Sequence, residues 1–220
     1  MVAVLLNRRR ALRDAVIMLG VAGVLTVAVA DSGSRDVVQR VDDWWLERMV
    51  SIRNEPLTWC CELLSVLGSA VVMWPLRLVA VGLLVVRRRY VQLGAFVLAI
   101  LTSELCIGPL KALIDRPRPP DPLVATSGAS FPSGHAIAAA VTAAGLVIAL
   151  LPPGRARLRW EIQAGLITFV MAMSRVYLGA HWLSDVVAGS LMGLGLALWW
   201  PAVFEEARSR RRAGRPRVGT

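Results

Sequence analysis

The sequence predicts an all-α membrane protein, a bundle of six transmembrane helices in a single domain over residues 1–220. The chain is 56% hydrophobic and only 18% charged, which is too apolar for an ordinary soluble domain of this length. Its apolar residues lie in long blocks, each close to the ~20 residues that a helix needs to cross a bilayer. Most of its arginines lie in clusters between those blocks.

Six apolar blocks define the expected helices. In chain order they are residues 15–30, 69–86, 91–110, 134–151, 160–178 and 182–203. The first block is short for a span, and its Ala28-Val29-Ala30 ending also resembles a secretory cleavage site. Cleavage there would leave five spans in the same orientation. We therefore expect a membrane core over residues 15–203 and a basic, disordered cytoplasmic tail over residues 204–220.

The arginine clusters predict the orientation. They are Arg8–Arg13, Arg87–Arg89, Arg155–Arg159 and Arg208–Arg217. With six spans, all four clusters lie on the side of both termini, and the positive-inside rule makes that side the cytoplasm of the cell. The spacing also explains the net charge of +10 without a nucleic-acid partner, so the bilayer is the expected partner. No feature of the sequence indicates an oligomeric state.

The connection after the first span is expected to lie outside the membrane. Residues 31–56 carry more acidic than basic side chains and are expected to form an outer loop. The following segment, residues 56–68, is amphipathic and too short to span, so we expect a helix in the outer membrane interface.

Two outward connections, residues 111–135 and 174–185, contain polar side chains that a lipid environment does not explain. The predicted topology puts both at the extracytoplasmic surface, where they can form one site. Lys111, Arg118 and Arg175 are fixed cations suited to phosphate oxygens. Lys111 is the only lysine in the chain, which favours a specific need for a compact ammonium group.

Both histidines of the chain, His135 and His181, lie in these connections. A neutral imidazole can act as a nucleophile or, once protonated, as an acid near neutral pH; the simpler alternative is two interfacial polar residues. Asp185 follows His181 by four residues, so a helix starting there places both side chains on one face. The carboxylate can then orient the imidazole, as in a catalytic triad.

Ser133 and Gly134 begin the fourth expected helix. A serine there can cap the helix, and free N–H groups at a helix start bind anions. Gly134 also lets a phosphate approach the backbone closely. Taken alone, this pair is only a helix cap.

Arg77 and Glu104 lie inside expected spans, where charged side chains are costly and are usually paired or functional. Each lies roughly 10–12 Å from the outer end of its helix, at 1.5 Å per residue. Because the two helices are sequential and antiparallel, we hypothesise an Arg77–Glu104 ion pair beneath the site. The alternative is that Glu104 contacts the substrate.

Three patterns appear in order along the chain. They are K-x6-R-P from Lys111 to Pro119, P-S-G-H from Pro132 to His135, and S-R-x5-H-x3-D from Ser174 to Asp185. Together they resemble the type 2 phosphatidic acid phosphatase superfamily, which includes lipid phosphate phosphatases and vanadium haloperoxidases. The resemblance covers roughly residues 57–203.

The resemblance implies a catalytic set. His181 would attack phosphorus to form a phosphohistidine that water later hydrolyses, Asp185 would orient His181, and His135 would protonate the leaving lipid oxygen. The implied phosphate-binding residues are Lys111, Arg118, Ser133, Gly134 and Arg175. The remaining motif residues are Pro119, Pro132 and Ser174. The resemblance implies no metal and no cofactor, and the physics agrees, since phosphoryl transfer depends mainly on positioning and charge stabilisation.

The expected function is therefore hydrolysis of a membrane lipid phosphate. An outward-facing site suits undecaprenyl diphosphate, a polyprenyl diphosphate of cell-wall synthesis, and phosphatidic acid or phosphatidylglycerol phosphate is the alternative. A lipid phosphotransferase would pass the phosphoryl group to an alcohol instead of water. A non-catalytic lipid transporter is disfavoured, because the chain shows no internal repeat.

Overall fold

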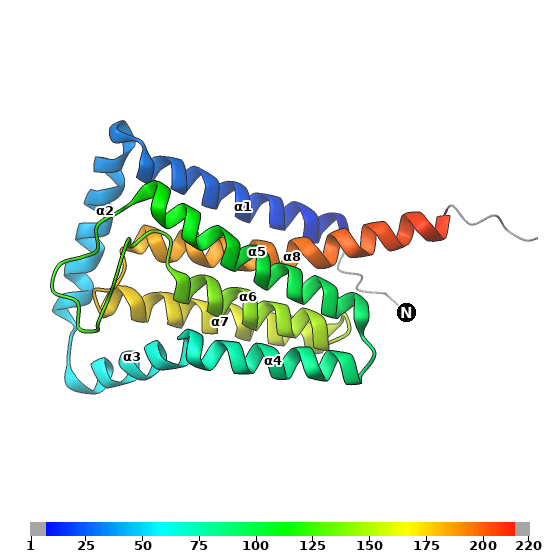
Figure 1. Ribbon diagram of the computed structural model, residues 1–220. Coiled ribbons are helices and arrows are strands. Elements are labelled where there is room, and N and C mark those ends of the chain that lie inside the picture. Colours follow the sequence, from blue (N-terminus) through cyan, green and yellow to red (C-terminus); the bar gives the residue numbers. More distant parts are fainter. Residues whose placement is uncertain (1–7, 214–220) are drawn as a thin grey trace, which may run out of the picture.

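The computed structural model describes residues 8–213, and every regular element among them is a helix. The helices are α1 (Arg8–Ala30), α2 (Ser32–Ser51), α3 (Glu55–Leu67), α4 (Ala70–Val86), α5 (Tyr90–Ile114), α6 (Gly134–Leu150), α7 (Arg155–Tyr177) and α8 (Leu183–Ala213). Most of them run lengthwise in an elongated bundle, and α2 lies across one end (Figure 1). The predicted all-α class is confirmed.

Each of the six apolar blocks coincides with a helix, but α8 continues beyond residue 203. The disorder expected after residue 204 is therefore wrong as far as residue 213, and residues 214–220 lie outside the described part. The extension has a physical basis, because its Glu, Ala and Arg residues are good helix formers. Arg210 Nε also lies 2.7 Å from Glu206 Oε1 across one helical turn, a spacing that supports a helix.

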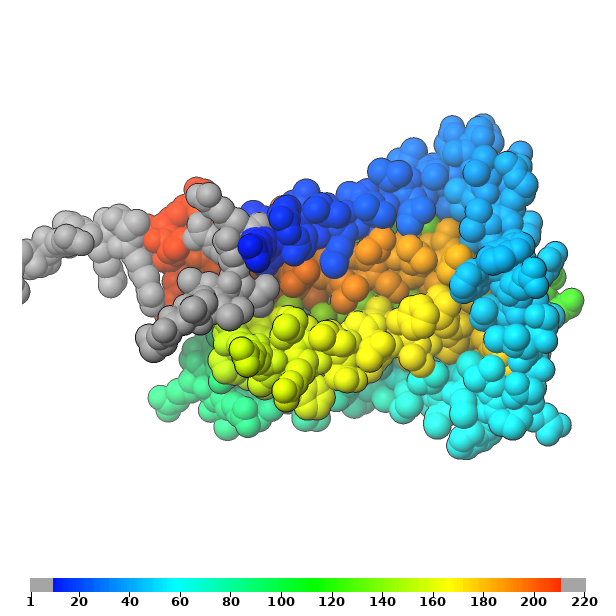
Figure 2. Space-filling view, turned by 180° about the vertical axis from the view of Figure 1, so that it is seen from behind, coloured from blue at the N-terminus to red at the C-terminus, as the bar shows by residue number. Residues whose placement is uncertain are grey.

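The expected outer loop over residues 31–56 is the second correction, because most of it is the helix α2. The Asp31 side chain caps that helix by accepting hydrogen bonds from the N–H groups of Gly33 and Ser34. Trp45 and Met49 of α2 pack on a cluster of buried apolar side chains from α6, α7 and α8. Seen from behind, α2 stands across the ends of α7 and α8 (Figure 2).

Three helices in the described part are long and apolar enough to cross a membrane: Arg10–Ala30, Tyr90–Ile114 and Leu183–Arg210. α3 and α4 would form a fourth span together, with a bend of 51° between them. Large apolar side chains on the outside of the bundle, such as Val71 at 82% and Phe169 at 60% exposure, are typical of a surface that faces lipid. The count of six spans stays a prediction.

Two close helix contacts hold the bundle together. α1 lies along α8 (Figure 1), where the side chain of Leu19 packs on Gly195. α8 also packs against α6 so closely that a Cβ at Gly189 would lie 2.8 Å from the Ser133 carbonyl oxygen, and one at Gly193 would lie 2.7 Å from that of Ile137. Glycine is needed at both positions because the two backbones approach each other so closely.

Candidate active site

The three sequence motifs meet at one end of the bundle. They occupy the end of α5, the connection from α5 to α6, the start of α6, the end of α7 and the start of α8. In Figure 1 all of these lie at the same end, next to α2 and α3, whereas the described parts of the segments that carry the arginine clusters lie at the other end. The fold therefore separates the two sets of basic residues by the length of the bundle.

His181 lies in the short connection between α7 and α8 and is only 3% exposed. Its Nδ1 atom is 3.4 Å from Asp185 Oδ2, and the same carboxylate oxygen accepts a hydrogen bond from the Trp182 N–H at 3.0 Å. Burial lowers the pKa of His181 to about 4, although the interaction with Asp185 opposes this shift. The imidazole is therefore neutral at pH 7.

Arg118 joins His181 to the long connection between α5 and α6. Its Nη1 atom lies 3.4 Å from His181 Nε2. The guanidinium donates hydrogen bonds to the carbonyl groups of Ser127, Gly128, Ala129 and Ala180. Lys111 Nζ donates to the same Ala129 carbonyl, so the structure brings Lys111 and Arg118 together beside His181.

His135 and Arg175 both contact Ser65 of α3, a residue that belongs to none of the three motifs. His135 Nε2 lies 3.1 Å from the Ser65 carbonyl oxygen, and Arg175 Nη1 donates to the Ser65 hydroxyl at 2.6 Å. α3 thus forms a wall of the site. A Cβ at Gly68, where α3 ends, would lie 2.9 Å from the His135 ring, so this wall is in direct contact with the histidine.

Two buried polar atoms of the site have no hydrogen-bond partner among the described residues: Ser133 Oγ and Arg175 Nε. Buried polar groups are usually satisfied, so such a group of atoms indicates a place that binds the polar atoms of a ligand. Ser133 is also the N-cap residue of α6, and its N–H donates to the Asp185 carbonyl at 3.1 Å. Gly134, the first residue of α6, follows directly.

The remaining motif residues have structural surroundings. The Ser174 hydroxyl donates to the Met171 carbonyl at 2.7 Å, one turn back along α7, and so points to its own helix. Pro119 and Pro132 are buried in the connection between α5 and α6. Pro132 follows a cis peptide bond from Phe131.

A buried ion network lies behind Asp185, and sequence reasoning missed it. Arg116 is 3% exposed, and its Nη1 atom donates to Asp185 Oδ1 at 2.8 Å. Its Nη2 atom donates to Asp42 Oδ2 of α2 at 2.7 Å. Ser184 joins both ends, since its hydroxyl lies 2.6 Å from Asp42 Oδ2 and from Arg116 Nη1. Arg116 stands two residues before Arg118 in the first motif, at a position that the motif leaves open.

The hypothesised contact between Arg77 and Glu104 is present in the structure. Arg77 Nη1 lies 2.7 Å from Glu104 Oε1, and Arg77 Nε donates to the Thr142 hydroxyl of α6 at 2.9 Å. The Arg77 side chain is 2% exposed and that of Glu104 is 36% exposed. Thr142 lies seven residues after His135 along α6, about 10 Å by helix rise, so the pair lies deeper in the bundle than the motifs.

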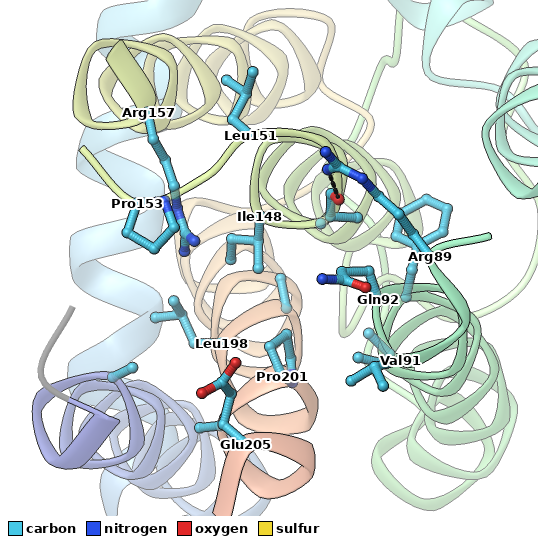
Figure 3. A pocket seen from close by; sticks show the side chains of 18 of the residues that line it. Arg89, Val91, Gln92, Ile148, Leu151, Pro153, Arg157, Leu198, Pro201 and Glu205 are labelled. Atoms are coloured by element: carbon cyan, nitrogen blue, oxygen red, sulfur yellow. Dashed lines mark hydrogen bonds between the residues drawn. The ribbon is translucent and has the colours of Figure 1, made fainter. Parts of the chain in front are cut away.

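A cavity of about 460 Å³ lies at the opposite end of the bundle, between α5, α6 and α8, and contains none of the motif residues (Figure 3). Its lining is mostly apolar, with Arg89, Gln92, Arg157 and Glu205 as the main polar side chains. Arg89 donates to the Leu150 carbonyl at 2.8 Å and so satisfies the end of α6. The chemistry that the motifs offer is therefore concentrated at the other end.

Comparison with known proteins identifies relatives of the chain. A family model described as the PAP2 superfamily matches residues 92–209. Phosphatidylglycerophosphatase B of Bacillus subtilis is 34% identical over 165 residues, which are 72% of this chain and 81% of that protein. Undecaprenyl-diphosphatase of Sulfolobus acidocaldarius is 42% identical over 65 residues, only 29% of this chain and 28% of that protein.

Two solved structures resemble the fold. The first transmembrane PAP2 type phosphatidylglycerolphosphate phosphatase from Bacillus subtilis gives a TM-score of 0.76 at 28% identity, and the match covers 92% of this chain and 99% of that one. LpxE of Aquifex aeolicus gives a TM-score of 0.62 at 23% identity over 73% of this chain and 94% of that one. The second likeness supports the fold alone.

Proposed function

The chain belongs to the PAP2 superfamily, and on that premise we propose that this membrane lipid phosphatase works through a covalent phosphohistidine on His181. The observation that carries the proposal is the state of that imidazole. It is buried and neutral, it has a carboxylate beside Nδ1, and the Arg118 guanidinium lies beside Nε2. A neutral nucleophile next to a fixed cation suits attack on an anionic phosphorus centre.

The reaction has two balanced steps. The Nε2 lone pair of His181 forms a bond to phosphorus while the bond from phosphorus to the lipid oxygen breaks, and His135, which must be protonated at this point, gives its proton to that oxygen and becomes neutral. The oxygen of a water molecule then forms a bond to phosphorus while the bond from phosphorus to His181 Nε2 breaks. His135 takes a proton from that water, inorganic phosphate leaves, and His181 is again a neutral imidazole. Asp185 accepts the Nδ1–H hydrogen bond and stabilises the charge that grows on the ring; this tautomer is assigned from the geometry.

The cations of the site hold the phosphoryl oxygens. Lys111, Arg118 and Arg175 donate to backbone carbonyl groups or to the Ser65 hydroxyl. A phosphate group would accept these hydrogen bonds in their place, and charge-assisted bonds to phosphate are the stronger ones. Ser133 Oγ and the Gly134 N–H at the start of α6 complete the set. We propose that this set needs no metal ion.

Two lipid substrates have support from relatives. Phosphatidylglycerol phosphate comes first, because the relative that is covered most fully is named phosphatidylglycerophosphatase B. Undecaprenyl diphosphate, which the sequence alone favoured, has support from a shorter match to undecaprenyl-diphosphatase. The chemistry at phosphorus is the same for both, since each presents an anionic phosphoryl group on a lipid.

We propose that the site faces the extracytoplasmic side of the plasma membrane and that both termini are cytoplasmic. The support is the separation of the site from the arginine clusters by the length of the bundle (Figure 1). In this arrangement residues 1–220 form a single domain with its membrane core over residues 15–203 and its basic tail over residues 204–220. α8 carries the helix into that tail as far as Ala213.

The test measures phosphate release by the purified protein in detergent, with EDTA present. The substrates are phosphatidylglycerol phosphate, undecaprenyl diphosphate and phosphatidic acid. We expect release that survives EDTA, and a loss of at least ~10³-fold in the His181→Ala variant because the nucleophile is gone. Acid-labile phosphate should remain on the wild-type protein after a quench and be missing from His181→Ala.

Arg157→Gln is the matched control, because it removes a partly buried ion pair at the opposite end of the bundle. No release from any of the three lipids by the folded protein would refute hydrolysis as the function. Loss of release in EDTA would refute the metal-free mechanism. Transfer of phosphate to an added alcohol at the expense of water would identify a phosphotransferase.

A further inference from the structure

We propose that Asp42 and Arg116 are positioning residues that set both the geometry and the charge of Asp185, and through it the reactivity of His181. The inference rests on the proposed function. It concerns an arginine outside the defining motif positions and a carboxylate on α2.

The hydrogen bonds around Asp185 divide its two oxygens between two tasks. Oδ1 accepts from Arg116 Nη1 at 2.8 Å, and Oδ2 accepts from the Trp182 N–H and faces His181 Nδ1. Asp185 is fully buried. A carboxylate held on one oxygen by a guanidinium cannot rotate freely, so Arg116 fixes the direction in which Oδ2 meets the imidazole.

Arg116 is itself held from the other side by Asp42. Arg116 Nη2 donates to Asp42 Oδ2 at 2.7 Å and to the Gln39 side-chain oxygen at 2.7 Å, both on α2. Asp42 is 1% exposed, and its Oδ1 accepts from the Ser184 N–H at 2.8 Å. α2 is thereby attached to the start of α8, next to Asp185.

The charges show why two carboxylates surround one guanidinium. Arg116 and Asp185 alone would form a neutral pair, and the guanidinium would withdraw much of the negative charge from His181. Asp42 shares the same guanidinium, so the buried group of Asp42, Arg116 and Asp185 keeps one net negative charge. That charge can stabilise the imidazole ring as it becomes positive during attack, and burial makes the effect larger than it would be in water.

Charged and titratable groups from several elements act on His181: Asp185 of α8, Arg175 of α7, His135 of α6 and Arg118 of the connection between α5 and α6. Lys111 of α5 acts in turn on Arg118 and Asp185. The carboxylate of Asp185 is the anion in this set. The negative charge on this carboxylate therefore affects the imidazole directly. Asp42 and Arg116 affect that charge from the side of Asp185 that faces away from His181.

The test compares a single and a double variant by kcat and KM for phosphatidylglycerol phosphate in detergent micelles. Asp42→Asn leaves Arg116 to neutralise Asp185, and we expect kcat to fall by about 10- to 100-fold with KM within about threefold, as for other groups that orient a reactive side chain. Asp42→Asn with Arg116→Met removes both charges and returns the net charge to that of the wild type. We expect this double variant to regain about tenfold of the lost kcat.

A second measurement uses the histidine signals of the isotope-labelled protein in NMR and needs no substrate. The pKa of His181 should be lower in Asp42→Asn than in the double variant, because the single variant loses negative charge and the double variant does not. Arg157→Gln, the control at the far end, should change neither kcat nor this pKa. Inactive wild-type protein with the expected order of pKa values would refute the proposed function and support this network.

Two outcomes would overturn the network. One is an Asp42→Asn variant that keeps kcat within twofold of the active wild type. The other is a double variant no more active than Asp42→Asn, with the same pKa of His181, because a merely structural network gives no rescue by a second deletion. If Asp42→Asn does not fold, the double variant still tests the proposal, because the double variant leaves no excess buried cation. A double variant that folds but has a kcat below a hundredth of the wild-type value would count against the proposal.

Discussion

At the site end of the bundle Arg116 reaches Asp42 and Asp185, which are 74 and 69 residues away in the sequence. At the opposite end Arg157 pairs with Glu161, four residues further along the same helix. A pair within one helix forms as soon as the helix forms and adds only a few tenths of a kcal/mol. Pairs between distant elements form only in the complete fold. Arg116 therefore joins distant elements around the site, whereas the ion pair of Arg157, although this side chain is also buried, stabilises only its own helix.

The largest expected effect is the lowered pKa of His181 at the site end of the bundle. Burial lowers its pKa to about 4, so in the folded protein the ring gains its proton only as the pH falls through about 4, more than two pH units below the ordinary value near 6.5. NMR of histidine-labelled protein measures this directly, because the chain has only two histidines and His135→Gln assigns the signals. Titration of His181 near pH 6.5 would contradict a buried, neutral nucleophile.

Removal of the Arg118 guanidinium should have the next largest effect. Arg118→Ala loses a cation beside His181 Nε2 and four hydrogen bonds that hold the connection between α5 and α6. We expect kcat/KM for the lipid phosphate to fall by about 100-fold or more. Arg118→Lys restores the charge without the planar fork and should recover less than about a tenth of wild-type activity. Arg118→Ala within threefold of wild type would remove Arg118 from the site.

The pair of Arg77 and Glu104 should matter for stability more than for catalysis. Glu104→Gln leaves the buried Arg77 cation with a weaker partner, and we expect a cost of about 1–3 kcal/mol in the free energy of unfolding. Arg157→Gln, which breaks a pair within one helix, should cost about 0.5 kcal/mol or less. Denaturant unfolding in detergent compares the two. A Glu104→Gln variant of normal stability that ranks the lipid substrates differently would instead place Glu104 against the substrate.

The sequence predicted those features that are local along the chain. Apolar blocks of about 20 residues located six of the helices, and the motif spacing led to His181, Asp185 and Arg118, which lie together in the structure. The spacing of four residues correctly brought Asp185 to His181, but α8 begins at Leu183, so His181 lies before the helix and not on its face as expected. The depth of Arg77 and Glu104 is recorded in the spacing, because helix rise converts residue number into distance.

The rest of the site depends on tertiary packing, which has no local signature. The contact of Ser65 with Arg175 joins residues 110 apart, and nothing around Ser65 distinguishes it from other polar residues. α2 was missed because its charges conceal the apolar stripe that Trp45 and Met49 provide. Arg116 did have a signal, an additional arginine before a proline in the most polar connection, but its partner Asp42 had none beyond the acidic character of its segment.

The close contact of α8 with α6 determines how far apart the two histidines of the site lie. His135 stands at the start of α6 and His181 just before α8, so the interface between these helices fixes the distance between the proposed acid and the proposed nucleophile. Gly189 and Gly193 leave less than the width of a methyl group in that interface. An alanine at either position would therefore push α6 and α8 apart and increase the distance between the two histidines. It would reduce activity although every reacting atom is still present.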